Sequence, residues 1–236
     1  MKILSIGNSF SQDAQRYFGG ICRAAGVEVK NTNLYIGGCS LERHVGNIGS
    51  DSPEYMLEEC GKYAERHVTL DEMISADEWD VVTLQEVSGR SFDYKYFEDF
   101  LPVLADYVHK NAPNAKIALH ITWGYENGSE RLANAGFATM KDMFSEIEAA
   151  YVKARELIGA DILIPSGRVI QRLADEGYTV HRDTFHLALG LGRYAVALTW
   201  FKTLFGGSVL DNSFASFDEP VTDEEIAAVK RIVEEL

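Results

Sequence analysis

The stretch "KILSIGNSF", residues 2–10, decides the fold. Its first part is mostly apolar, as in a buried strand, and a glycine, an asparagine and a serine follow before a helical pattern begins. A strand that turns abruptly into a helix is the usual opening unit of a parallel α/β sheet. Ser9 stands at this turn, where the N–H groups of a helix start either cradle a phosphate or assist a nucleophile. Which of these two functions applies has to be inferred from the other polar residues of the chain.

Five short apolar runs recur along the chain, separated by longer helical patterns. The runs cover residues 2–7, 27–36, 79–87, 115–123 and 160–167. The helical patterns cover residues 11–25, 93–110, 137–158, 187–205 and 222–236. Several runs are nearly continuous, which is typical of strands buried on both faces. We therefore expect one domain over residues 1–236, a flavodoxin-like three-layer α/β sandwich with a five-stranded parallel sheet and helices on both faces.

One segment breaks the alternation of strand and helix. The stretch "EYMLEECGKYAERHVTL" contains two short strand patterns around Gly61 and Lys62, and "LDEMISADEW" after it predicts a brief helix. The segment predicts a small inserted hairpin around residues 53–68. We expect it to pass over the carboxyl edge of the sheet, where binding loops gather.

Composition excludes several classes of partner. The formal net charge of −14 argues against nucleic acid and anionic membranes, because both require a basic surface. No apolar run approaches the roughly 20 residues that a membrane span needs. The apolar N-terminal stretch has the pattern of a strand rather than of a signal peptide, so we expect a cytoplasmic protein. Three scattered cysteines, Cys22, Cys39 and Cys60, predict neither a disulfide framework nor a cysteine zinc site.

Ser9 is a nucleophile only if a histidine takes its proton and a carboxylate orients that histidine. An acid three residues before a histidine occurs twice, as Asp106 with His109 and as Asp183 with His186. The first pair falls on the polar side of an amphipathic helix, so we expect it to be solvated. The second pair precedes the last long helix in a loop, from which both side chains can turn toward the sheet edge. Asp183 and His186 are therefore the better candidates.

Three short motifs in this order resemble those of the SGNH/GDSL hydrolases: "GNS" at 7–9, "GG" at 37–38 and "DxxH" at 183–186. The longer stretches "ILSIGNSFSQDA", "YIGGCSLERH", "WDVVTLQEVS" and "DTFHLALGLGRYAVALTW" resemble a less-studied bacterial branch of that superfamily, known mainly as a domain of unknown function. The resemblance extends from Ile3 to Trp200, nearly the whole chain.

The resemblance implies a role for each matching residue. Ser9 corresponds to the nucleophile, His186 to the base and Asp183 to the carboxylate that orients it. Gly38, rather than Gly37, corresponds to the glycine whose N–H joins the Ser9 N–H in an oxyanion hole.

Two departures from the family pattern concern the same site. The usual "GDS" is "GNS" here, with Asn8 in the middle, which is not one of the family's catalytic positions. The "GxND" block after the third parallel strand, whose asparagine supplies a third oxyanion donor, is absent. The stretch "TLQEVSG" offers Gln85 instead, and its longer side chain predicts a donor that reaches the hole from an earlier position.

Further residues are candidates for the pocket around Ser9. Asn8, His44, Glu86 and Trp123 lie near the expected site in the sequence. Each also has a purely structural interpretation: His44 as a loop residue, Glu86 as a solvated strand end, Trp123 as core. Ser11 is the nearest rival nucleophile, but two residues later it suits the first turn of the helix and capping.

Two functions follow from these patterns. The first is a serine esterase that hydrolyses a carboxylic ester through an acyl-enzyme; the resemblance implies a short-chain, acetyl ester of a carbohydrate. The alternative is a non-catalytic flavodoxin-like module that binds a phosphate or flavin at Gly7–Ser11, although that turn has a single glycine and no basic residue before Arg16. We expect no cofactor for the esterase. We also expect no metal, since no HExxH pattern or cysteine pair accompanies the histidines.

Overall fold

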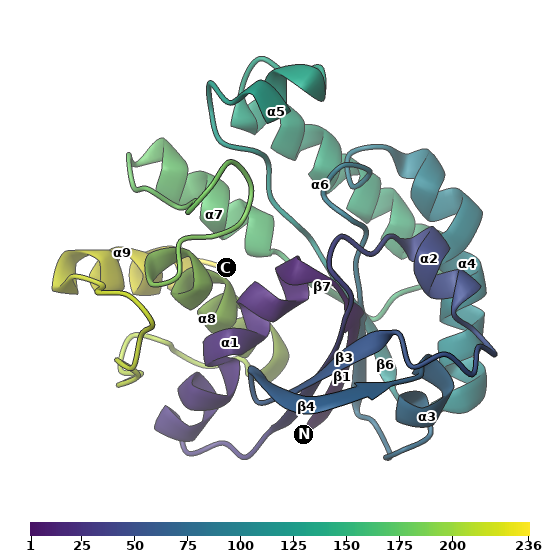
Figure 1. Cartoon of the computed structure of the whole chain (residues 1–236). Coiled ribbons are helices and arrows are strands. Elements are labelled where there is room, and N and C mark those ends of the chain that lie inside the picture. Colours follow the sequence, from purple (N-terminus) through teal and green to yellow (C-terminus); the bar gives the residue numbers. More distant parts are fainter.

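The computed structural model describes residues 1–236, and its centre is a single sheet with helices on both faces (Figure 1). The strands are β1 (Lys2–Gly7), β2 (Lys30–Tyr35), β3 (Tyr55–Glu59), β4 (Lys62–Val68), β5 (Val81–Leu84), β6 (Lys116–His120) and β7 (Ile162–Ile164). Their order in the sheet is β4-β3-β2-β1-β5-β6-β7. The five parallel strands, β2-β1-β5-β6-β7, have the flavodoxin-like order, which confirms the predicted fold class.

The sheet has seven strands, however, and not the five that the sequence predicted. The hairpin expected around residues 53–68 is present as β3 and β4, and it joins the sheet. β3 pairs antiparallel with β2, with Leu57 opposite Leu34, and both side chains are buried. The pairing occupies the edge of β2 that a five-stranded sheet would leave open. β4 is mostly exposed, so a strand with many charged residues forms the new edge.

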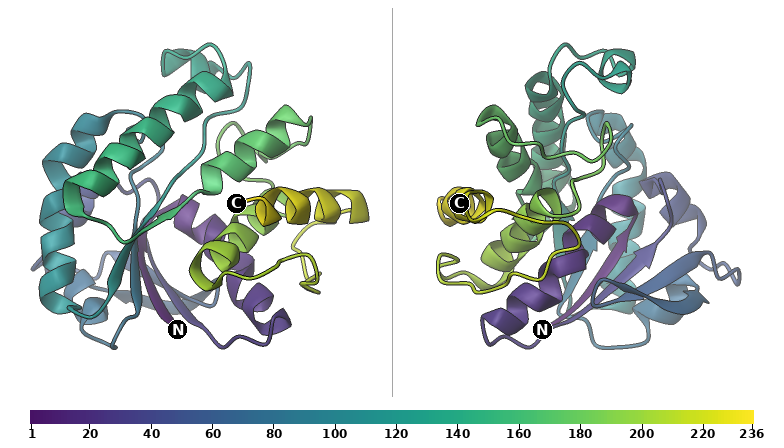
Figure 2. Two further views of the ribbon diagram at one scale, coloured as in Figure 1. Left: turned by 180° about the vertical axis from the view of Figure 1, so that it is seen from behind. Right: turned by 60° about the vertical axis from the view of Figure 1, so that its left-hand side comes forward.

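The helices form two layers. They are α1 (Ser9–Ala24), α2 (Leu41–Gly46), α3 (Leu70–Ile74), α4 (Tyr94–Asn111), α5 (Glu130–Asn134), α6 (Met140–Ile158), α7 (Ser166–Asp175), α8 (Leu191–Phe205) and α9 (Asp223–Glu234). Helices α1, α7, α8 and α9 pack together on one face, and α2, α4 and α6 on the other (Figure 2). Each layer has its own buried apolar cluster against the sheet. None of the helices is both long and apolar enough to span a membrane.

The long helices and the brief α3 match the sequence patterns, whereas α2, α5 and α7 were not predicted. Helices α2 and α5 have six and five residues, fewer than two turns, so an apolar repeat cannot show in them.

The order of the strands places β1 between β2 and β5, and the segments that follow these strands meet at the carboxyl edge of the sheet. The turn after β1 is tight. Asn8 caps α1 by accepting the N–H of Phe10 at 3.0 Å. A Cβ atom on Gly7 would lie 2.2 Å from Ser11 Oγ, so only glycine fits there.

We expect Gly7→Ala to destabilise the fold by about 2 kcal/mol, because the new methyl group displaces the Ser11 hydroxyl from Asn8 and Asn33. Gly46→Ala is the matched control, since a Cβ atom there meets nothing within 4 Å and alanine favours a helix. Urea unfolding measures both. Equal stability of the two variants would contradict this account of the turn.

Candidate active site

Ser9, His186 and Asp183 form a continuous hydrogen-bonded chain. Ser9 is the first residue of α1, and the other two lie in the loop between α7 and α8. His186 Nε2 is 3.0 Å from Ser9 Oγ, and His186 Nδ1 is 2.8 Å from Asp183 Oδ2. An ionised carboxylate only accepts, so Nδ1 carries the proton and Nε2 is left to accept the Ser9 O–H. The three side chains that the sequence singled out are thus brought together in the geometry of a base and its orienting acid.

The Asp183 carboxylate is held in its ionised form. Burial raises its pKa, but the N–H groups of His186 and Phe185 donate to Oδ1 at 2.7 and 2.9 Å, and with the His186 side chain they lower the pKa to about 2. Asp183 therefore stays an acceptor for His186 throughout the neutral range.

A buried carboxylate, Asp13, ties this loop to α1. Asp13 lies one turn after Ser9 and is fully buried. It accepts Arg193 Nε at 2.7 Å, Arg182 Nη1 at 3.1 Å and the N–H of Leu187, the residue after His186, at 3.2 Å. Helix α1 therefore positions both Ser9 and the segment that carries His186.

Trp123 supports the loop from behind. Its Nε1 donates to the Phe185 carbonyl at 2.8 Å, and its ring stacks on Phe10 with 4.1 Å between centroids. The side chain is fully buried, so the prediction that Trp123 lines the pocket is wrong. The aromatic ring fills the space between the sheet and the loop instead.

A cavity of about 200 Å³ opens beside Ser9. Its lining includes Asn8, Ser9, Tyr35, Gly37, Gly38, Val87, Ser88, Phe185 and His186. Gly38 has a φ of +62°, and no protein acceptor takes its N–H. Ser9 is the first residue of its helix, so its N–H has no intrahelical partner either. Asn8 Nδ2 draws the two segments together by donating to the Cys39 carbonyl at 2.9 Å.

Gln85 lies beneath Asn8 and does not line this cavity. Its Nε2 donates to Asn8 Oδ1 at 2.7 Å, and its Oε1 is 2.8 Å from Nδ1 of the buried His120. His120 continues the chain through Nε2 to Ser166 Oγ at 2.9 Å. These contacts are those of a residue that supports Asn8, and one Nε2 hydrogen remains for a further acceptor. The role of Gln85 as a third oxyanion donor stays a prediction.

Glu86 and His44 do not line the cavity and are both fully buried. Glu86 Oε1 accepts the N–H of Leu41 at 3.2 Å and of Val87 at 2.6 Å, so it holds the segment after Gly38 against the end of β5. His44 Nδ1 is 2.9 Å from Tyr55 Oη. Burial lowers the pKa of His44 to about 3, so this ring is neutral. Of these three candidate pocket residues, Asn8 lies in the lining of the cavity, whereas the prediction is wrong for Glu86 and His44, because both side chains turn inward to hydrogen-bond partners.

The rival residues have other places. Ser11 is buried, and its hydroxyl donates to the Asn8 carbonyl at 2.8 Å; the cap is Asn8 and not Ser11. Asp106 and His109 are exposed on α4, as predicted. No three His, Cys, Asp or Glu side chains are arranged to hold a metal ion.

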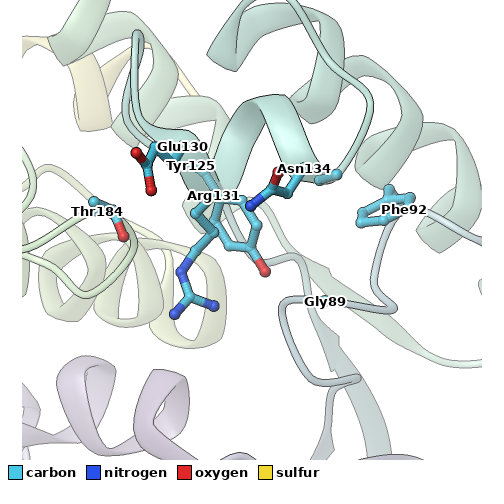
Figure 3. A pocket seen from close by; sticks show the side chains of 8 residues that line it. Gly89, Phe92, Tyr125, Glu130, Arg131, Asn134 and Thr184 are labelled. Atoms are coloured by element: carbon cyan, nitrogen blue, oxygen red, sulfur yellow. The ribbon is translucent and has the colours of Figure 1, made fainter.

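A second cavity has a volume of about 860 Å³, and Figure 3 shows the side chains that line it. It is lined by Gly89, Phe92, Tyr125, Glu130, Arg131, Asn134, Ala135 and Thr184. The two linings are adjacent in the chain at two points. Gly89 directly follows Ser88 of the smaller cavity, and Thr184 directly precedes Phe185 of the smaller cavity. No sequence pattern predicts this cavity, because its wall depends on α5, which is too short to show an apolar repeat.

Solved structures share this architecture. A protein from Slackia heliotrinireducens, described provisionally as an SGNH hydrolase, is 24% identical with a TM-score of 0.64; the match covers 86% of this chain and 98% of that one. An acetyl xylan esterase is 15% identical with a TM-score of 0.58, covering 87% of this chain and 100% of that one. The fold is therefore that of the SGNH/GDSL hydrolases, which confirms the resemblance seen in the sequence.

The family is narrower than that superfamily. A family model described as "Domain of unknown function (DUF4886)" matches residues 2–231, and the chain belongs to this family. A DUF4886 protein from Bacteroides uniformis is 32% identical with a TM-score of 0.91, and the match covers 100% of this chain and 93% of that one. No curated protein matches the chain.

Glu86 makes the stability of this site depend on pH. Burial raises its pKa from 4.5 to about 7, although the N–H groups of Val87 and Leu41 oppose the shift. Because the folded-state pKa exceeds the unfolded one, the folded protein binds the extra proton between these values. We therefore expect the stability of the wild type to fall relative to Glu86→Gln as the pH rises from about 4.5 to 7, by at most about 3 kcal/mol.

The Glu86→Gln variant keeps an acceptor oxygen for both N–H groups but cannot ionise. Urea unfolding at several pH values between 4.5 and 8 measures the difference. Parallel stability curves for the two proteins would contradict a buried, titrating Glu86.

Proposed function

We propose that this protein is a serine esterase that hydrolyses carboxylic esters. The observation that supports it is the hydrogen-bonded chain from Ser9 Oγ through His186 to Asp183, with distances of 3.0 and 2.8 Å. An oriented base at this distance from a hydroxyl is what nucleophilic catalysis by serine requires. The folds of lipolytic and carbohydrate-esterase neighbours agree with this reaction.

The reaction has two halves. Ser9 Oγ attacks the ester carbonyl while His186 Nε2 takes the hydroxyl proton, and the N–H groups of Ser9 and Gly38 stabilise the oxyanion of the tetrahedral intermediate. The intermediate collapses to the acyl-enzyme, and the alcohol leaves with the proton from His186. A water molecule then attacks the acyl carbonyl with His186 as its base and releases the carboxylic acid. Asp183 stabilises the transient imidazolium in both halves.

The substrate that we propose is a short-chain, acetyl ester of a carbohydrate. The cavity of about 200 Å³ beside Ser9 suits a small acyl group, since a long chain would need a longer channel. The larger cavity next to it offers room for the alcohol part. The similarity in fold to an acetyl xylan esterase supports the same choice by analogy.

The alternative of a phosphate- or flavin-binding module at Gly7–Ser11 has no such support. The lining of the cavity at this turn contains no lysine or arginine. The Ser9 hydroxyl is also within hydrogen-bond distance of His186, whose side chain lies where a bound phosphate would contact Ser9. We do not propose this function.

A fluorophosphonate probe should label Ser9 alone, because no other serine has a histidine and a carboxylate arranged to take its proton. Ser9→Ala should abolish both the labelling and the hydrolysis of p-nitrophenyl acetate with an unchanged thermal midpoint. Peptide mapping of the labelled protein and a chain-length series of p-nitrophenyl esters provide the measurements. Ser11→Ala is the matched control for the mapping. A probe found on Ser11 or Ser88, or a preference for long acyl chains, would contradict the assignment.

Gln85→Ala separates the two roles of this amide. Because Gln85 contacts Asn8 and His120, we expect Gln85→Ala to lower both the thermal midpoint and kcat. We expect Gln85→Asn to show the same fall in kcat only if its shorter side chain no longer reaches Asn8. A transition-state donor would behave differently: its removal costs about 10²–10³ in kcat at unchanged KM and unchanged stability. That second pattern would establish the third oxyanion donor predicted from the sequence.

A further inference from the structure

The larger cavity beside the site is lined along its length by α5 and by Tyr125 from the segment before it, with Thr184 at one end and Gly89 and Phe92 at the other (Figure 3). The segment before α5 is fastened to the loop of the base, because Glu126 N donates to the Thr184 carbonyl at 2.9 Å. The cavity therefore has a fixed position relative to Ser9 and His186. Any group that binds in it is held beside the reacting ester.

Arg131 supplies the one positive side chain in the lining of this cavity. Its guanidinium lies over the Phe185 ring at 4.1 Å and near the Tyr125 ring at 5.5 Å. In Figure 3 the group extends from α5 into the cavity, beside the hydroxyl end of Tyr125. Stacking on aromatic faces orients the guanidinium plane and leaves its N–H edge available for a ligand.

Other arginines near the site are already paired. Arg182 and Arg193 bind Asp13, and Arg90 binds Glu42 at 2.6 Å. Arg131 makes no ion pair with any carboxylate of the protein, although Glu130 precedes it in the chain and lines the same cavity. In Figure 3 the Glu130 carboxylate lies on the side of Thr184, apart from the guanidinium. Although the chain has a net charge of −14, the one cationic side chain in the lining of this cavity is left without a carboxylate partner.

We propose that this cavity binds the alcohol part of the ester and that Arg131 binds a carboxylate on it. The inference rests on the proposed esterase function. A planar guanidinium edge matches a carboxylate with two parallel hydrogen bonds. The neighbouring Glu130 disfavours a dianion such as a phosphate, while its oxygens and the Asn134 amide suit sugar hydroxyls. The substrate class is therefore an acetylated sugar acid rather than a neutral sugar.

The test compares O-acetylated glucuronic acid with O-acetylated glucose, which differ only at C6, a carboxylate in the acid and a hydroxymethyl group in glucose. We expect the wild type to prefer the acid, and Arg131→Ala to lower kcat/KM for the acid by about 10- to 100-fold, mainly through KM, as the loss of a charged hydrogen bond implies. The same variant should change kcat/KM for acetylated glucose by less than about threefold. Arg23→Ala is the matched control and should change neither value. Arg23 also lacks an ion pair, and it lies in the last turn of α1, at the end of the helix far from Ser9.

Protection from the probe gives a readout that does not need turnover. Free glucuronate should slow fluorophosphonate labelling of the wild type but not of Arg131→Ala, and glucose should slow neither. If Ser9 is labelled and p-nitrophenyl acetate is cleaved, but glucuronate gives no protection and the acid no preference, the role of Arg131 is refuted and the esterase stands. Absence of both labelling and hydrolysis would refute the proposed function itself.

Discussion

The site depends on the burial of one carboxylate, Asp13. Ser9 and His186 are 177 residues apart in the sequence, and the proposed reaction requires their side chains to stay within hydrogen-bond distance. Asp13 ensures this because a fully buried charge has to be neutralised, and its partners are Arg182, Arg193 and the N–H of Leu187. Arg193 also binds Asp218 at 3.0 Å, and Asp218 binds Arg16 of α1. The ion network thus fixes α1, the loop that carries His186 and the start of α8 as one unit.

A second constraint explains why asparagine suits position 8. Its Oδ1 accepts from the N–H of Phe10 and from Gln85 Nε2, while its Nδ2 donates to the Cys39 carbonyl. An aspartate at this position accepts the first two bonds but cannot donate the third. "GNS" and Gln85 are therefore parts of one arrangement, in which the amide joins the turn after β1 to the segment of Gly38 and to the end of β5. The two departures from the family pattern are therefore linked: Asn8, which replaces the aspartate of "GDS", is hydrogen-bonded to Gln85, which lies where the "GxND" block is absent.

The sequence predicts what depends on local patterns. The five parallel strands, the long helices and the Asp183–His186 spacing all appear as apolar runs, repeats or short motifs within one segment. Seven strands instead of five, the inward turn of Glu86 and His44, and the position of Trp123 behind the loop depend on contacts between segments far apart in the chain. The periodicity of apolar residues within a segment does not predict such contacts. The sequence does not predict the cavity around Arg131 for the same reason. Helix α5 is short, and Phe185, the ring that Arg131 contacts, lies more than fifty positions further along the chain.

Phe185 lines the smaller cavity and contacts Arg131 of the larger one. Its ring is 3.8 Å from the His186 ring, and the Arg131 guanidinium lies 4.1 Å over the same ring. Its backbone is fixed at both ends, because its N–H donates to Asp183 and its carbonyl accepts from Trp123. A single aromatic side chain therefore contacts His186 in the smaller cavity and Arg131 in the larger one. Since Asp183, Phe185 and His186 share one short loop, a displacement of Phe185 would alter the positions of His186 and Arg131 together. The precision of the proposed reaction and the selectivity for its alcohol would then have one structural origin, the rigid loop that Asp13 and Trp123 hold in place.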